Sequence, residues 1–325
     1  MPKIKKYFRN HRRVVSNGMG YLDLYAKFLK KFFKPKALIR VVFDCSNGTT
    51  GIILKRLFLK SKLRSILINY NPDGSFPAHG PNPMVPGALR DLQLAVKKYK
   101  ADLGVIFDAD GDRVFFVDER GREIHSDIVA GLLGVAVKED VILDLRCGYL
   151  ARELLVKAGK KIIDSRVGAY FIKKLMREKK VEFAGELSAH YYFKDFFFAD
   201  AGIFAAIQMI NQVSLLKIRG RSLAKWIDSL PTYFRSGELN FKVVNKSEAM
   251  KRIENFYKKS ASKISYLDGV KMEFSDAAHA EALAKAWWFN IRPSNTENLL
   301  RLNLEAKDRK VFQSKLDEIK KLIEK

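Results

Sequence analysis

The chain has 325 residues, of which 47% are hydrophobic, and it carries a formal net charge of +24 at pH 7. A chain of this length and hydrophobic content buries a sizeable core, and its length predicts about two or three globular domains. Its two cysteines, Cys45 and Cys147, lie far apart in apolar stretches, which excludes a disulfide framework. No stretch has the length of a membrane span, and the basic N-terminus lacks the apolar core of a signal peptide, so we expect a cytoplasmic protein without membrane contact.

The positive charge is compatible with nucleic acid, an anionic membrane or a small phosphorylated ligand as a partner. The lysines and arginines are spread through every segment, without a repeated basic-aromatic pattern or a recognisable nucleic-acid module. This distribution favours a solvated, lysine-rich surface over a nucleic-acid-binding function.

Residues 1–36 are predicted to form a basic tail followed by an amphipathic helix. Apolar side chains recur at helical spacing between Tyr21 and Phe33 and give this helix one strongly apolar face. That face needs a partner, which is either the body of the protein or another chain.

Two similar mixed α/β domains are predicted over residues 37–139 and 140–232, where apolar strands alternate with helical patterns. The first domain is expected to hold strands at 37–45, 63–69, 101–107 and 114–118 and helices at 50–59, 87–99 and 125–137. The second is expected to hold strands at 141–145, 161–164 and 181–184 and helices at 149–158 and 168–179.

The character of the sequence changes after Pro231, and residues 233–325 are predicted to form an α+β domain with an antiparallel sheet. The expected strands are 238–244, 270–274, 287–292 and 299–306, with helices at 247–260 and at the C-terminus. An alanine-rich stretch at 276–285 predicts an extra helical excursion between two of the strands.

Three carboxylates crowd the loop between the two strands that end the first α/β domain. Asp108, Asp110 and Asp112 alternate there with Ala109 and Gly111. Like charges this close repel one another unless a cation joins them, and hard carboxylate oxygens suit Mg²⁺ or Ca²⁺. The loop therefore predicts a divalent-metal site, whereas the alternative is a solvated acidic turn.

Two further loops gather polar side chains at short spacing. Glu186, Ser188 and His190 alternate, so in an extended loop they project to one side, where a carboxylate and a hydroxyl can bind adjacent sugar hydroxyls. A second loop follows the strand at 287–292 and offers a cradle for a phosphate. Its members are Arg292, Ser294, Asn295 and Thr296, with Arg301 on the next strand. Taken alone, the first spacing is weak and favours a structural histidine, and the second favours an ordinary turn between strands.

A family resemblance links these three loops. The sequence Asp-Ala-Asp-Gly-Asp-Arg at 108–113 resembles the metal loop of the phosphohexomutases, the phosphomannomutase/phosphoglucomutase superfamily. Gly-Glu-Leu-Ser-Ala-His at 185–190 resembles the sugar-recognition loop of that family, and Arg-Pro-Ser-Asn-Thr-Glu at 292–297 resembles its phosphate-binding loop. The three motifs occur in the family's order, and the similarity runs from about Tyr21 to the C-terminus.

The resemblance implies interconversion of hexose 1-phosphate and hexose 6-phosphate, of mannose or glucose, through a 1,6-bisphosphate. It implies that the three aspartates hold Mg²⁺, that Arg113 faces the phosphoryl group, and that the other two loops bind a phosphohexose. The first domain of the family, whose catalytic serine lies in a Ser-His-Asn-Pro context, has no counterpart in these 325 residues. Three explanations follow from this difference. The phosphoserine comes from a separately encoded domain, the sequence is a fragment of a longer protein, or the chain is a metal-dependent sugar-phosphate binding or regulatory module.

Overall fold

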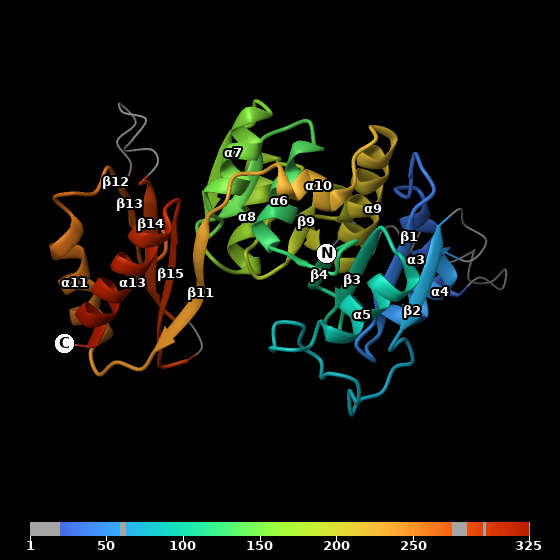
Figure 1. The fold of residues 1–325 in the computed structure, drawn as a ribbon, viewed down its shortest axis with the longest axis horizontal. Helices are drawn as coiled ribbons and strands as arrows, with labels where there is room; N and C mark the ends of the chain where they lie inside the picture. Colours follow the sequence, from blue (N-terminus) through green and yellow to red (C-terminus); the bar gives the residue numbers. More distant parts are fainter. Residues whose placement is uncertain (1–19, 59–62, 275–284, 295–296, 325) are drawn as a thin grey trace.

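The computed structural model describes residues 20–58, 63–274, 285–294 and 297–324. Three five-stranded sheets follow one another along this part of the chain, and Figure 1 shows the third, C-terminal sheet standing apart from the first two. The fold class predicted from the sequence is thereby confirmed, since two mixed α/β units precede an antiparallel C-terminal domain. No helix in these ranges is both long and apolar enough to cross a membrane.

The first unit is a mixed sheet in the strand order β2-β1-β3-β4-β5. Strands β1, β2 and β3 run parallel, and β4 and β5 continue the sheet antiparallel. Strands β3 and β4 are buried along their whole length, which explains why both appear in the sequence as unbroken apolar runs. The elements are β1 Arg40–Asp44, α4 Thr50–Phe58, β2 Arg64–Ile68, α5 Arg90–Tyr99, β3 Leu103–Phe107, β4 Val114–Asp118, β5 Glu123–Ile124 and α6 Ser126–Val135.

The second unit repeats this pattern in the strand order β7-β6-β8-β9-β10. Its first three strands are again parallel, and its last two are antiparallel. The elements are β6 Val141–Asp144, α7 Tyr149–Lys157, β7 Ile162–Ser165, α8 Ala169–Lys179, β8 Phe183–Gly185, β9 Tyr191–Phe193, the 3₁₀ turn η1 Lys194–Phe196, β10 Ala199–Asp200, α9 Gly202–Ile218 and α10 Leu223–Asp228. The chain therefore builds two units of the same topology, as the alternating pattern predicts.

The common topology places the predicted metal and sugar loops at equivalent positions. Residues 108–113 connect β3 to β4, and residues 186–190 connect β8 to β9. In both units this is the point where a buried parallel strand turns back into an antiparallel partner. The two turns meet, because Arg113 and His190 form an antiparallel β-bridge and the Val114 amide donates to the Ala189 carbonyl.

The two units are joined by their last long helices. Helix α6 packs against α7 and β8 of the second unit, whereas α9 packs against β3 and β4 of the first. Helix α9 begins at the metal loop, where the Gly202 amide donates to the Gly111 carbonyl over 3.0 Å. A Cβ on Gly202 would lie only 2.7 Å from that carbonyl oxygen, so this approach requires glycine. The domain boundaries at 139 and 232 stay predictions, because one buried core spans both units.

No element is predicted from the sequence at 202–218, where the structure has the 17-residue helix α9. Buried side chains occur on nearly every side of its first three turns. A helix that is apolar all round shows no polar face to mark its period, which is why the pattern gave no helical signal. The core that joins the two units was consequently missed as well.

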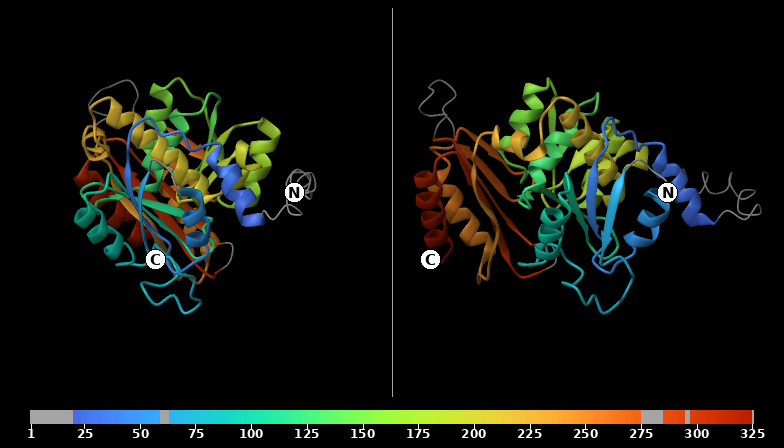
Figure 2. Two further views of the ribbon diagram at one scale, coloured as in Figure 1. Left: turned by 90° about the vertical axis from the view of Figure 1, so that its right-hand side faces the viewer. Right: turned by 45° about the vertical axis from the view of Figure 1, so that its right-hand side comes forward.

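Helix α3, Tyr21–Lys30, packs on the body of the protein. Its Leu24 and Leu29 are buried, and the Phe28 ring stacks on Phe197 with ring centroids 5.7 Å apart. The two side views in Figure 2 place this helix at the end of the molecule opposite the C-terminal sheet. Of the two partners left open by the sequence, the structure therefore supports the body of the protein.

Phe204 on α9 is the centre of an aromatic cluster and is 1% exposed. Its ring lies 4.7 Å from Phe32, 4.7 Å from Phe193 and 5.6 Å from Phe196, measured between centroids. We expect Phe204→Ala to lower the free energy of unfolding by about 3–5 kcal/mol, because it leaves a cavity between α9, β9 and the segment that follows α3.

Urea denaturation followed by circular dichroism measures this loss. Phe256→Ala is the matched control, since that ring is 54% exposed on the C-terminal domain and should cost less than about 1 kcal/mol. Equal losses in the two variants would show that the cluster contributes no more to stability than one exposed ring does.

The C-terminal domain is an antiparallel sheet in the order β11-β15-β14-β13-β12, packed against two helices. Its elements are β11 Phe234–Phe241, α11 Lys246–Tyr257, β12 Lys263–Ser265, β13 Val270–Phe274, β14 Trp287–Pro293, β15 Leu300–Ala306 and α13 Arg309–Glu324. Strand β11 begins four residues before the expected start at 238, because Phe234 and Arg235 already pair with β15 ahead of a bulge between Arg235 and Glu238. Most of the helical excursion expected at 276–285 lies outside the described residues.

Candidate functional site

The metal loop brings its three carboxylates together. Asp108, Asp110 and Asp112 each offer one oxygen, and these oxygens lie within 4.8 Å of one another. Asp108 is buried at the end of β3, where its Oδ1 accepts the backbone amides of Gly111 and Arg113, each over 3.1 Å. The tight turn at Gly111, with φ +77°, folds the loop back on Asp108.

The pKa values of two carboxyl groups in this loop are shifted in opposite directions. Burial raises the pKa of Asp108 to about 6, whereas the hydrogen bond from His190 lowers the pKa of Asp112 to about 2. Hard oxygens from three residues at this spacing fit a divalent cation such as Mg²⁺, which would neutralise their mutual repulsion. The donor set thus agrees with the predicted metal site.

Arg113 was expected to face the transferred phosphoryl group. Its Nε donates to Asp108 Oδ2 over 2.7 Å, and its Nη1 donates to Asn82 Oδ1 over 3.3 Å. The guanidinium group is thus held by Asp108 of the metal loop and by Asn82. Contact between Arg113 and the transferred phosphoryl group stays a prediction.

The predicted sugar loop is a tight turn that buries Glu186. The Glu186 amide donates to the His190 carbonyl over 2.9 Å, and Ala189 adopts a left-handed conformation with φ +67°. Ser188 Oγ and His190 Nδ1 lie 3.1 Å apart, so the turn holds all three predicted side chains close together. Burial and the neighbouring Asp144 raise the pKa of Glu186.

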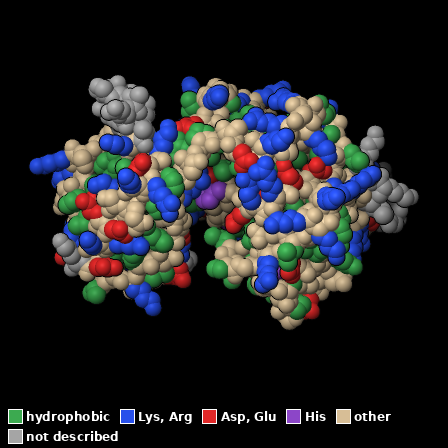
Figure 3. Space-filling view, viewed as in Figure 1, with side chains coloured by type: hydrophobic (Ala, Val, Ile, Leu, Met, Phe, Trp, Pro, Cys, Tyr) green, Lys and Arg blue, Asp and Glu red, His purple; other side chains and the backbone are tan. Residues whose placement is uncertain are grey.

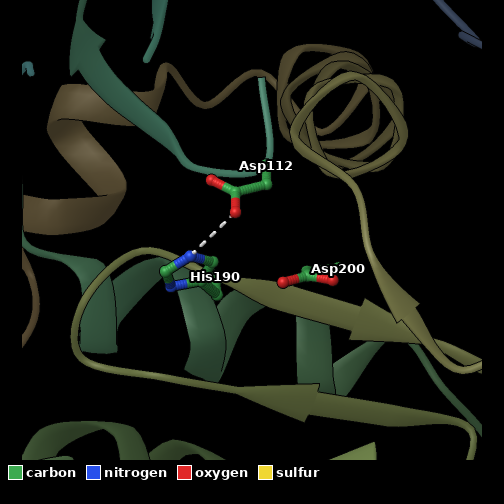
Figure 4. A group of neighbouring side chains, drawn as sticks. All are labelled: Asp112, His190 and Asp200. Atoms are coloured by element: carbon green, nitrogen blue, oxygen red, sulfur yellow. Dashed lines mark ion pairs between the residues drawn. The ribbon is translucent and has the colours of Figure 1, made fainter. Parts of the chain in front are cut away.

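His190 connects the two loops. Its Nε2 lies 3.5 Å from Asp112 Oδ2, and its Nδ1 lies 3.5 Å from Glu186 Oε2. Figure 4 shows the His190 ring facing Asp112, with Asp200 of β10 beside them. Burial opposes protonation of His190, but Asp112 and Glu186 outweigh it and raise its pKa. The metal and sugar loops therefore form one continuous polar network.

Arg146 is a central residue of the site that the sequence analysis missed. It is 5% exposed and pairs with Asp144 through two donors, Nη2 at 2.8 Å and Nε at 3.2 Å. Its Nη2 also lies 3.4 Å from Glu186 Oε1. A usable signal was present, because the buried strand 141–144 ends on Asp144 and Arg146 follows two residues later, at the carboxyl edge of a parallel sheet.

The predicted phosphate cradle lies on β14 and β15. Arg292 is 2% exposed, and it faces Arg301 directly in the strand register. Ser294 follows at the end of β14, and its Oγ accepts the Glu297 amide over 3.2 Å. Asn295 and Thr296, which belong to the same prediction, lie outside the described residues.

Four of the predicted site residues, Glu186, Ser188, Arg292 and Arg301, line one open cavity of about 600 Å³. The carboxylates of the metal loop, Arg113, His190 and Ser294 are not among its lining residues. Glu186 and Ser188 come from the second α/β unit, whereas Arg292 and Arg301 come from the C-terminal domain. Arg146 and Glu238, which were not predicted, complete the polar lining between them. Figure 3 shows the hollow between the C-terminal domain and the rest of the molecule, with a histidine side chain visible in it. The fold and the cavity together define an α/β protein with a carboxylate loop beside an arginine-lined cleft.

Comparison with known proteins identifies the family that has this architecture. Three family models match in order, namely phosphoglucomutase/phosphomannomutase alpha/beta/alpha domain II at residues 20–121, alpha/beta/alpha domain III at 125–234 and the C-terminal domain at 238–322. Domain I is not among the matches. The chain belongs to the phosphoglucomutase/phosphomannomutase family of the phosphohexomutase superfamily.

Individual relatives agree with this assignment. A phosphomannomutase of Methanocaldococcus jannaschii is 38% identical over 94% of this chain and 66% of its own length. A phosphomannomutase of Vibrio cholerae is 34% identical over 94% of this chain and 67% of its own length. The crystal structure of a phosphoglucomutase/phosphomannomutase family protein from Burkholderia thailandensis shares the fold, with a TM-score of 0.81 at 24% identity over 93% of this chain and 63% of that one. The chain thus spans about two thirds of the length of these proteins.

Proposed function

We propose that this chain provides the metal, sugar and phosphate sites of a phosphohexomutase that interconverts hexose 1-phosphate and hexose 6-phosphate. The main support for this proposal is the cavity between two parts of the protein. Glu186 and Ser188 line it from the second α/β unit, and Arg292 and Arg301 line it from the C-terminal domain. A ligand held there would meet hydroxyl-binding groups at one end and guanidinium groups at the other. A phosphohexose has this distribution of groups.

Phosphoryl transfer depends on positioning and charge neutralisation, which the residues of the cleft can supply. Arg292 and Arg301 would hold the phosphate that does not react, while Glu186 and Ser188 would orient the sugar ring by its hydroxyls. A Mg²⁺ ion bound by Asp108, Asp110 and Asp112 would neutralise charge on the phosphoryl group that is transferred. The transferred phosphate requires a phosphoserine, which we assign to a first domain of the family type.

We expect mannose 6-phosphate to raise the melting temperature of the protein, because a ligand at a hundredfold excess over its Kd stabilises the native state by about 2.7 kcal/mol. Arg292→Ala and Glu186→Ala should each remove most of the shift, since they act at opposite ends of the ligand. Differential scanning fluorimetry with increasing ligand measures the effect.

Arg177→Ala is the matched control, because that arginine is exposed on α8 and away from the cleft. A short DNA duplex tests the alternative that the net charge of +24 binds any polyanion. A shift of equal size with DNA, unaffected by either substitution in the cleft, would contradict the proposal. Binding of the sugar phosphate without turnover under any condition would instead favour a binding or regulatory module.

A further inference from the structure

One carboxylate stands in the middle of the predicted phosphate cradle. Glu238 Oε2 lies 2.9 Å from Arg292 Nη2 and 3.0 Å from Arg146 Nη1, and its Oε1 lies 3.1 Å from Arg301 Nη1. The three guanidinium groups come from three separate segments, namely the end of β6, β14 and β15. Glu238 is therefore the common partner of Arg146, Arg292 and Arg301.

The backbone of β11 directs Glu238 into the cradle. The register of β11 against β15 shifts between Arg235 and Glu238, and Gly237 within this bulge has φ +64°. A bulge of this kind adds a residue to one strand and re-aims the side chain that follows it. Asn303 holds the bulge through a bond of 3.2 Å to the Gly237 carbonyl. The backbone of strand β11 thus determines the direction of the Glu238 side chain.

Two arginines of the cradle have hydrogen-bond donors that Glu238 does not occupy. In the described part of the chain, Nε of Arg292 and Nε of Arg301 are buried without a hydrogen-bond partner. Arg292 is itself 2% exposed, so its free donor is largely shielded from solvent. Buried donors without partners are costly, and a tetrahedral anion with several acceptor oxygens would satisfy them. These donors indicate a site for a ligand more highly charged than one carboxylate.

Glu238 is ionised at neutral pH in this setting. Burial acts to raise its pKa, but Arg146, Arg292 and Arg301 outweigh that effect and lower the pKa. A phosphate group that enters the cradle therefore meets a negative charge on the same donors. It has to displace the carboxylate from Arg292 and Arg301 or share these donors with it, and either outcome weakens phosphate binding.

We propose that Glu238 is a resident carboxylate that competes with the phosphate group of the ligand for Arg292 and Arg301 and so limits how tightly the cleft holds a sugar phosphate. This inference rests on the proposed function of the cleft. In the ligand-free protein Glu238 neutralises the cradle and keeps its arginines in place. When the ligand is bound, Arg146 remains as a partner for the carboxylate, because it lies on the side of Glu238 that faces the second α/β unit.

The test is isothermal titration with inorganic phosphate and with mannose 6-phosphate. Glu238→Gln keeps the shape of the side chain and removes its charge, so both ligands should bind about tenfold more tightly than to the unmodified protein. Asp228→Asn is the matched control, because Asp228 also pairs with two arginines, Arg120 and Arg122, each at 2.7 Å, but its side chain is 39% exposed and lies outside the cleft. This control should change the affinity by less than about threefold, since exposed pairs are screened by water.

Melting curves without ligand show whether Glu238→Gln folds. Glu238→Asp serves if it does not, because the shorter side chain keeps the charge but reaches Arg292 and Arg301 less well, and phosphate should again bind more tightly. Unchanged or weaker binding by the folded variant would overturn the inference and make Glu238 a structural part of the cradle.

The outcomes also separate this inference from the proposed function. If phosphate binds the unmodified protein and Arg292→Ala lowers the phosphate affinity at least tenfold, the assignment of the phosphate cradle is supported. The Glu238 variants alone then decide the inference. If Arg292→Ala binds phosphate as well as the unmodified protein does, the cradle itself is wrong and both proposals fall.

Discussion

A polypeptide of these 325 residues, supplied with Mg²⁺ and a hexose 1,6-bisphosphate, is expected to convert mannose 1-phosphate to mannose 6-phosphate at no measurable rate. None of its serines lies in a Ser-His-Asn-Pro context, so the chain offers no predicted carrier for the transferred phosphate. Adding a phosphorylated first domain from a relative should raise the rate by a factor on the order of 10³ or more, because charge neutralisation and positioning then act on one substrate.

A coupled assay that detects mannose 6-phosphate measures both rates. The control is the same first domain with its catalytic serine replaced by alanine, which can dock but cannot carry phosphate. Rapid turnover by the 325 residues alone would show that a phosphate carrier within them has been overlooked. The absence of turnover with any added domain would favour the binding-module alternative.

Replacing Asp108, Asp110 and Asp112 together by asparagine is expected to weaken Mg²⁺ binding at least about a hundredfold, because it removes the charge of every carboxylate in the loop. The apo form of the triple variant should not melt at a much lower temperature, since relief of repulsion between the carboxylates offsets the lost bond between Asp108 and Arg113.

Isothermal titration with MgCl₂ measures the affinity. Asp228→Asn is a suitable control, because this aspartate forms a surface cluster with Arg120 and Arg122 that lies outside the metal loop. Mg²⁺ affinity that is unchanged in the triple variant would remove the metal assignment, whereas an equal loss in the control would indicate nonspecific charge binding.

The sequence predicted much of this fold because its elements are marked locally. Strands β3 and β4 are fully buried runs of strand length, and the three carboxylates between them have no role in packing. Helix α5 has a clear apolar face that buries Leu92 and Val96. Such features depend on neighbours in the chain, so periodicity and composition are enough to find them.

The parts that were missed depend on residues distant in the sequence. Arg146 follows a buried strand, which is a local signal, but its pairing with Glu238 arises only where the second unit meets the C-terminal domain. Glu238 is a single charged residue within strand β11. Nothing in the local pattern states that Glu238 will lie between Arg292 and Arg301, because a bulge in β11 decides it. The link from Asp112 through His190 to Glu186 likewise requires the two equivalent turns to meet in space.

The central claim is that one cleft holds a single phosphohexose between the sugar loop and the arginine cradle. Titration of glucose 1,6-bisphosphate into the Mg²⁺-saturated protein tests it most directly. We predict one binding site per chain, weakened at least about tenfold by Glu186→Ala and by Arg292→Ala, and unchanged by Arg177→Ala. Equal affinity in all three variants, or several equivalent sites per chain, would contradict the account.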